Sequence, residues 1–149
     1  MTASSGSTDK TDLQVLHIDD DATLRDLTAE LLERVDDGIT VQSESDPTTI
    51  PGRIKAEPID CVVSDYRMPE MDGLELCQRV RETHPDIPFF LFTTEYSEEV
   101  VDRAMSFGVT DYIQKESGVT HYKLLAHRIR NAVRHHRIRE RIQELEDPA

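Results

Sequence analysis

The sequence has no long apolar run, few cysteines and few lysines, and each shortage excludes a class of protein. No stretch of the 149 residues approaches the ~18 apolar residues of a membrane-spanning helix. The first twelve residues are rich in Ser, Thr and Asp without an apolar run, so we expect neither a signal peptide nor an anchor. These features predict a soluble, cytoplasmic protein with no membrane partner.

The two cysteines, Cys61 and Cys77, do not have CxxC or metal-binding spacing. We interpret them as small buried side chains in a reducing compartment, because isolated cysteines behave as small apolar residues.

Lysine is scarce and the acidic residues dominate. Four lysines stand against thirteen arginines, and 17 basic residues against 30 acidic ones leave a net charge of −13. An acidic, lysine-poor surface is typical of proteins that stay soluble in high salt, so we expect a halophilic source. The negative charge also argues against direct binding of nucleic acid.

Short apolar segments alternate with helical patterns along the chain, which predicts an α/β fold with a doubly wound parallel sheet. The flavodoxin-like (βα)5 arrangement has the strand order 2-1-3-4-5. We expect a disordered tail over 1–11, one domain over 12–130, and a helical extension or linker over 131–149. The strands are expected at 13–18, 39–43, 60–64, 87–92 and 111–113, and the helices at 21–37, 46–57, 73–83, 97–107 and 119–146.

Two helices carry specific predictions. Leu24, Leu27, Leu31 and Val35 recur at spacings of three and four, which predicts that they form the buried face of the first helix. The second helix contains two prolines and a glycine, so we expect it to be short or kinked.

Acidic residues follow two of the apolar segments. Asp65 ends the third strand, and Asp19 and Asp20 end the first. The expected strand order brings these carboxylates to one edge of the sheet, where open α/β sheets bind ligands. Two carboxylates about 4 Å apart repel by roughly 4 kcal/mol at an effective dielectric constant near 20, so the cluster needs a cation. Oxygen ligands suit Mg²⁺.

Two further residues end strands at the same edge. Thr93 ends the fourth strand and supplies a hydroxyl donor, and Lys115 follows the fifth and supplies a positive charge. Taken singly, each is more often an ordinary surface or strand-end residue. Their arrival at one edge together with the carboxylates predicts a site for a phosphoryl group.

The chain resembles the receiver domain of two-component response regulators. The resemblance covers about residues 12–130 and is carried by Val15–Asp21, Ser64–Gly73, Leu91–Thr94 and Asp111–Lys115, in the family's order and spacing. It implies a phospho-accepting signalling switch rather than an enzyme.

The resemblance also implies a metal site. Asp65 would be the phospho-acceptor, and Asp20 and Asp65 would ligate Mg²⁺ directly, with Mn²⁺ as a substitute. Asp19 would act mainly through water, and the backbone carbonyl of Arg67 would be a further ligand.

The resemblance also implies which residues respond to phosphorylation. Thr93 would bond the phosphoryl group, Lys115 would pair with it, and Tyr112 would be the aromatic switch residue. The resemblance implies a sensor histidine kinase as partner and a signalling face formed by the fourth helix, fifth strand and fifth helix. A homodimer through that face or through the last helix is a further expectation.

Three positions depart from the family's pattern. Glu116 replaces the usual proline after the lysine, so the peptide geometry there is open. Thr94 stands where a small residue is common, and Glu95 could repel or position a hydrolytic water.

The C-terminal part is basic where the rest is acidic. Residues 1–114 have a net charge of −16 and residues 115–149 of +3. We interpret the basic helix as a solvated face rather than a DNA-binding element, and its histidines, at 121, 127, 135 and 136, as surface residues. Ile138, Ile142 and Leu145 continue at coiled-coil spacing for about one and a half heptads.

The sequence does not decide what the receiver domain acts on. The receiver could work alone or be the first domain of a transcription regulator or hybrid sensor kinase, and a cut in a helical linker is the preferred interpretation. A phosphate-independent interaction module is a second class, against which the intact set of site residues argues. An aspartate-based hydrolase is a third, but it needs an aspartate where Arg67 stands.

Overall fold

A five-stranded parallel sheet forms the centre of the protein, in a computed structural model that describes residues 12–116 and 118–146. The strand order is β2-β1-β3-β4-β5, so the predicted flavodoxin-like topology is confirmed. The expected tail over 1–11 lies outside the described residues. The strands are β1 (Leu13–Ile18), β2 (Ile39–Glu44), β3 (Cys61–Ser64), β4 (Phe89–Thr93) and β5 (Asp111–Gln114).

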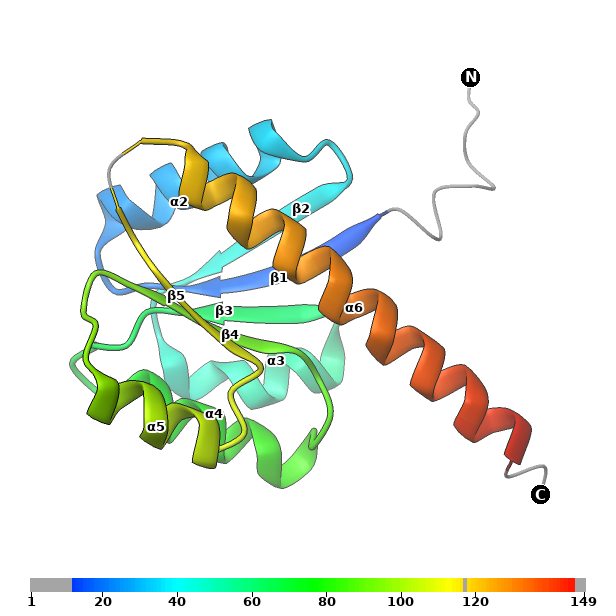
Figure 1. Cartoon of the computed structure of the whole chain (residues 1–149). Coiled ribbons are helices and arrows are strands. Elements are labelled where there is room, and N and C mark those ends of the chain that lie inside the picture. The colour runs from blue at the N-terminus through cyan, green and yellow to red at the C-terminus, as the bar shows by residue number, and fades with distance from the viewer. Residues whose placement is uncertain (1–11, 117, 147–149) are drawn as a thin grey trace.

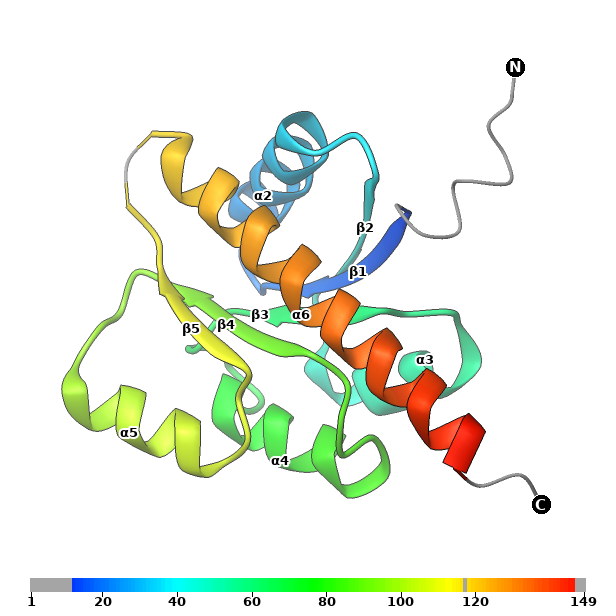
Figure 2. The ribbon, with the colours of Figure 1, turned by 45° about the vertical axis from the view of Figure 1, so that its right-hand side comes forward.

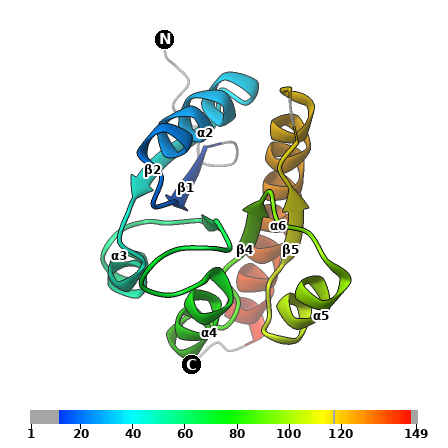
Figure 3. The same ribbon diagram turned by 90° about the vertical axis from the view of Figure 1, so that its left-hand side faces the viewer.

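Helices cover both faces of the sheet (Figure 1). Two of them, α2 and α6, lie on one face, and α3, α4 and α5 lie on the other, as the rotated views show (Figures 2 and 3). Because each strand is followed by a crossover helix, every strand runs in the same direction and all their carboxyl ends meet at one edge. The helices are α2 (Ala22–Val35), α3 (Ile50–Ala56) after the 3₁₀ turn η1 (Pro47–Thr49), α4 (Gly73–Thr83), α5 (Glu98–Ser106) and α6 (Thr120–Glu146).

The sheet divides the apolar core into two layers. Leu16 and Ile18 of β1 face the layer under α3, α4 and α5, whereas Leu13 and Val15 face the layer under α2 and α6. This alternation follows from the two-residue period of a strand. Both faces of β1, β3 and β4 are buried, which explains their nearly continuous apolar sequences.

The predicted helix caps are present. The Asp21 side chain accepts the backbone N–H of Leu24, and the Ser97 hydroxyl accepts that of Val100. Asp72 forms the predicted capping box with Glu75 at the start of α4. These caps satisfy amides that have no partner within their helices, and they position each helix start at the same sheet edge.

The prediction for the buried face of α2 was partly wrong. Leu24 and Leu27 are 39% and 43% exposed, and the buried residues are Thr28 and Leu32. The buried side of the helix is therefore turned away from Leu24 and Leu27, and Arg25 on that side donates to the backbone carbonyl of Asp19. Only the later turns, with the partly buried Leu31, reach the core.

The second helical segment is short, as expected. It consists of the 3₁₀ turn η1 and the seven-residue α3. Pro51 lies in the first turn of α3, where the missing N–H would have had no partner within the helix. The proline therefore sets where the helix begins.

The interpretation of His121 as a surface residue was wrong. Its side chain is buried in the first turn of α6, with its ring centroid 5.7 Å from that of Phe92 and 4.4 Å from that of Tyr122. Helix α6 covers the end of β4 at this point, so an imidazole on its inner face packs in the core. The first turn of α6 is thereby tied to the residue that precedes Thr93.

His17 is a second buried histidine, next to the last residue of β1. Neither of its ring nitrogens has a hydrogen-bond partner among the described residues. Burial, the largest cause, together with the nearby positive charges of Lys115 and Arg25 lowers the pKa of His17 to about 3. The imidazole is therefore neutral in the folded protein at every pH at which the protein is expected to work.

We expect His17 to make the folded state acid-sensitive. The unfolded chain takes up a proton near pH 6.5 and the folded chain only near pH 3, so falling pH favours unfolding. Below pH 6.5 the cost should approach about 1.4 kcal/mol per pH unit. Denaturant melts between pH 7.5 and 4.5 should show this extra slope in the wild type and lack it in His17→Leu. The exposed His135→Gln is the matched control, and equal slopes in all three proteins would contradict the assignment.

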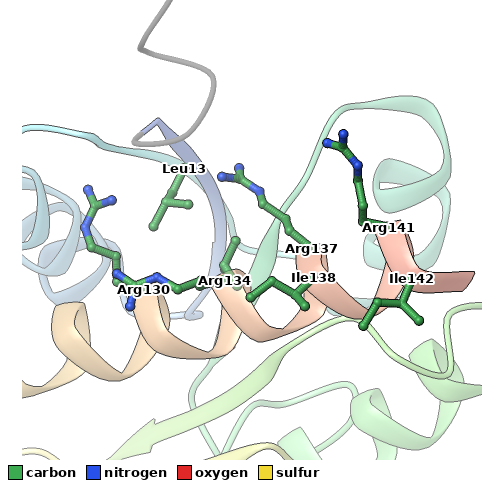
Figure 4. A pocket seen from close by; sticks show the side chains of 8 residues that line it. Leu13, Arg130, Arg134, Arg137, Ile138, Arg141 and Ile142 are labelled. Carbon is green, nitrogen blue, oxygen red and sulfur yellow. The ribbon is translucent and has the colours of Figure 1, made fainter. Parts of the chain in front are cut away.

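Helix α6 extends past the amino-terminal edge of the sheet (Figure 1). Arg137 holds the extension against the domain by an ion pair with Asp60 at 3.2 Å and a hydrogen bond to the carbonyl of Asp12 at 3.0 Å. A groove of about 550 Å³ lies beside it (Figure 4). Ile138 and Ile142 line this groove and are about half exposed. No helix among the described residues is long and apolar enough to span a membrane.

Candidate functional site

Asp65 lies immediately after β3 at the carboxyl edge of the sheet. Its backbone N–H donates to the carbonyl of Ile18 at 3.1 Å, which ties the start of the loop to the end of β1. Its Oδ1 accepts the N–H of Tyr66 at 2.7 Å, and 18% of its side chain is exposed. The carboxylate is therefore oriented by the backbone and open to solvent on one side.

Asp19 is fully buried beside it. Its Oδ1 accepts the N–H of Asp21 at 3.0 Å, and its backbone carbonyl accepts Arg25 Nη1 at 2.8 Å. Burial raises the pKa of Asp19, and the negative charge of Asp65 raises it too, against the opposing effects of the Asp21 N–H and Lys115. Burial is the largest of these effects, so the charged form of the Asp19 carboxylate is costly here without a cation beside it.

Lys115 places a positive charge beside these two carboxylates. Its Nζ lies 3.4 Å from Asp19 Oδ2 and 3.8 Å from Asp65 Oδ2, with only 8% of the side chain exposed. The ammonium also lies 5.3 Å from the centroid of the Phe92 ring. Its backbone N–H donates to the carbonyl of Thr93 at 2.8 Å, which fixes the start of the loop after β5. The predicted convergence of strands one, three and five is thus found in the structure.

Asp20 and Arg67 line a shallow hollow of about 290 Å³ next to this cluster. Met68, Pro69 and Asp72 complete its wall, so the hollow lies between the end of β1 and the loop after β3. Among residues 12–116 and 118–146, no three His, Cys, Asp or Glu side chains are arranged to hold a metal ion. The donor chemistry nevertheless suits a hard cation, because the side-chain donors gathered at this edge are the carboxylate oxygens of Asp19, Asp20 and Asp65.

Thr93 and Tyr112 both form hydrogen bonds with Glu95, in the loop between β4 and α5. The Thr93 hydroxyl accepts the N–H of Glu95 at 3.3 Å, so its own proton is free to bond a ligand. The Tyr112 hydroxyl donates to the backbone carbonyl of Glu95. Burial first, and then the charge of Glu95, raise the pKa of Tyr112 to about 12, so this hydroxyl remains a donor at neutral pH.

The side chains of Arg67 and Glu95 form a contact that sequence reasoning missed. Arg67 was expected to matter through its backbone carbonyl, and Glu95 was expected to act on a water. In the structure the guanidinium and the carboxylate pair with each other. Their opposite charges, each two residues after a site residue, were the available signal. The Lys115–Glu116 peptide, left open on sequence grounds, is not cis.

Comparison with known proteins matches this arrangement to one family. The pattern of the response regulator receiver domain covers residues 15–127. The chain belongs to the response regulator receiver family. This confirms the expected receiver domain of two-component signalling.

Relatives of this receiver domain include proteins of different lengths. A chemotaxis CheY homologue of Campylobacter jejuni is 31% identical over 105 residues, which cover 69% of this chain and 81% of the homologue. The cyclic di-GMP phosphodiesterase response regulator RpfG of Xanthomonas campestris is 32% identical over 105 residues, which cover 69% of this chain and 28% of that protein. The receiver domain therefore spans less than a third of RpfG.

Solved receiver structures share the fold. The chemotaxis response regulator CheY4 of Vibrio cholerae superposes with a TM-score of 0.71 at 25% identity, covering 80% of this chain and 99% of CheY4. NtrX from Brucella abortus superposes with a TM-score of 0.76 at 22% identity, covering 90% of this chain and 30% of NtrX. The second likeness bears on the fold alone.

Proposed function

We propose that Asp65 accepts a phosphoryl group from the phosphohistidine of a partner sensor kinase in the cytoplasm. The observation that supports this most directly is Lys115 Nζ lying between Asp19 and Asp65 at the carboxyl edge of the sheet. An ionised carboxylate needs no general base to act as nucleophile, but it repels an incoming phosphoryl group. A buried cation at this distance offsets that repulsion.

Each residue then has a defined role. One oxygen of Asp65 attacks phosphorus, the bond to the histidine nitrogen breaks, and the imidazole takes back a proton from solvent. The product is an acyl phosphate at Asp65. Lys115 pairs with the transferred group, and the free hydroxyl proton of Thr93 donates to one of its oxygens.

Asp20, Asp65 and the backbone carbonyl of Arg67 would hold Mg²⁺, or Mn²⁺ in its place, with Asp19 acting through water. When bound, the metal would neutralise charge on the phosphoryl oxygens. The contacts of Asp19 with the Asp21 N–H and with Lys115 suit such an outer position, because both of its oxygens already have a partner.

Labelling with acetyl phosphate and Mg²⁺ tests the proposal. We expect wild type to gain one hydroxylamine-labile phosphoryl group and Asp65→Asn to gain none. The exposed Asp102→Asn is the matched control and should label like wild type. Omitting Mg²⁺ should abolish the label. If wild type stays unlabelled, the chain is a phosphate-independent interaction module instead. If Asp65→Asn labels as well as wild type, the phosphoryl group is on another residue and Asp65 is not the acceptor.

We also propose that the receiver domain comprises residues 12–130 and that residues 131–149 are a helical extension leading to an output domain. This rests on the exposed apolar residues of α6 beyond the sheet: Ile138 is 51% exposed, Ile142 47% and Leu145 75%. Such a row on the part of a helix that extends past the sheet is suited to packing against another helix.

A further inference from the structure

The ion pair between Arg67 and Glu95 joins the two loops that carry the site. Arg67 lies two residues after Asp65, and Glu95 two residues after Thr93. Arg67 Nε donates to Glu95 Oε1 at 2.7 Å and Nη2 donates to Oε2 at 2.9 Å. Both bonds of the guanidinium fork are therefore used, which fixes the relative orientation of the two side chains.

The Arg67 guanidinium also contacts the preceding residue of its own loop, Tyr66. Its carbon lies 5.2 Å from the centroid of the Tyr66 ring. The pKa of Glu95 is lowered, chiefly because its carboxylate accepts hydrogen bonds from Arg67, so the pair is fully charged at neutral pH. The contact is thus a bidentate, charged bridge between the two loops.

Glu95 is the point where this bridge meets the switch residues. Its N–H donates to the Thr93 hydroxyl, and its carbonyl accepts the Tyr112 hydroxyl. The ring of the next residue, Tyr96, meets the Tyr112 ring edge-on at a centroid distance of 6.0 Å. One residue therefore contacts Thr93 and Tyr112 through its backbone and Arg67 through its side chain.

We propose that Arg67 is a positioning residue for the switch: through Glu95 it holds the loop after β4 so that the Glu95 carbonyl keeps Tyr112 in its hydrogen-bonded position. This deepens the proposed function and rests on it for the meaning of the switch. The loop after β3, which carries Asp65 and Arg67, is then coupled to Tyr112 already in the unphosphorylated protein. Loss of the guanidinium frees the loop and lets Tyr112 leave the carbonyl.

The test reads Tyr112 directly in the unphosphorylated protein. The four tyrosines are replaced by 3-fluorotyrosine, and the ¹⁹F resonance of Tyr112 is assigned by its loss in Tyr112→Phe. In Arg67→Gln and in Glu95→Gln we expect the hydrogen-bonded population of Tyr112, relative to the free one, to fall roughly two- to fivefold, the range for a well-oriented surface ion pair. The Arg67 side chain is 73% exposed, so its removal leaves the core intact.

Two controls make the result specific. Arg79→Gln removes an exposed arginine of α4 and should leave the Tyr112 resonance at the wild-type position. The double variant Arg67→Glu with Glu95→Arg restores the pair with exchanged charges and should recover most of the lost population. An unmoved Tyr112 resonance in Arg67→Gln, or no recovery in the exchanged pair, would overturn the proposal.

Failure of this inference is distinguishable from failure of the proposed function. The Tyr112 resonance is read without phosphorylation, whereas the proposed function is read as a label on Asp65. A labelled protein with an unmoved Tyr112 overturns the coupling alone. An unlabelled protein with a shifted Tyr112 leaves the coupling intact and overturns the phospho-acceptor assignment.

Discussion

Replacing Lys115 with methionine is expected to lower the free energy of unfolding by about 3 kcal/mol at pH 7 without added metal, because one partner of a buried ion pair is removed. Methionine keeps most of the volume of the lysine stem and its contact with Phe92. What is lost is the ammonium beside Asp19, a fully buried carboxylate whose pKa is already raised by burial. The same change should prevent efficient labelling of Asp65.

The pH dependence of this loss has a definite sign. Without the ammonium, the pKa of folded Asp19 rises further above its unfolded value, so proton uptake stabilises the folded variant as pH falls. The difference from wild type should therefore be largest at pH 7 and shrink toward pH 4. Urea melts at both pH values measure it. The exposed Lys123→Met should change stability by less than about 0.5 kcal/mol. A uniform small loss for Lys115→Met would show that Asp19 does not depend on it.

A second large effect is expected from Gly73→Ala, at the first residue of α4. The Gly73 N–H donates to the carbonyl of Tyr66 at 2.7 Å, so the loop after β3 closes tightly here. A Cβ on Gly73 would lie 2.6 Å from the backbone carbonyl oxygen of Asp65 and 2.5 Å from Leu91. Because one of these atoms belongs to the backbone, the loop itself must shift. We expect a loss of about 3 kcal/mol, at the upper end for overpacking, together with slower labelling of Asp65.

Gly52→Ala is the matched control for Gly73→Ala. Gly52 lies inside α3, and a Cβ there would meet no atom within 4 Å. Alanine should stabilise this helix by about 0.5–1 kcal/mol through its higher helix propensity. Thermal melts of both variants and the rate of acetyl phosphate labelling measure the contrast. A Gly73→Ala protein as stable and as readily labelled as wild type would show that the loop has room to adjust.

Much of this fold could be predicted from local patterns. The apolar strands, the caps at Asp21, Asp72 and Ser97 and the convergence of Asp19 with Asp65 follow from strand order and helix-start chemistry, and the structure contains them. These features are set by residues close together in sequence or by the direction of parallel strands.

The errors came from contacts that depend on how elements are placed in space. Leu24 and Leu27 have the spacing of a core face, yet they are exposed and α2 buries Thr28 and Leu32 instead. His121 is one of several histidines of a basic helix, and nothing in its local sequence indicates that the end of β4 lies under it. The ion pair joins Arg67 and Glu95, which are 28 positions apart in the sequence. It depends on how the loops after β3 and β4 lie relative to each other, which no sequence periodicity encodes.

Helix α6 is one unbroken rod that begins at the reacting edge of the sheet and ends beyond the opposite edge. Its 27 residues span about 40 Å at 1.5 Å per residue. Its first turn rests on Phe92, the neighbour of Thr93, and farther along Arg137 anchors it to Asp60. A tilt of about 5° about the first turn would carry the far end through roughly 3.5 Å over that length. The rod is thus a continuous connection from the phosphorylation edge to the opposite side of the domain, and the ion pair of Arg137 with Asp60 opposes such a tilt.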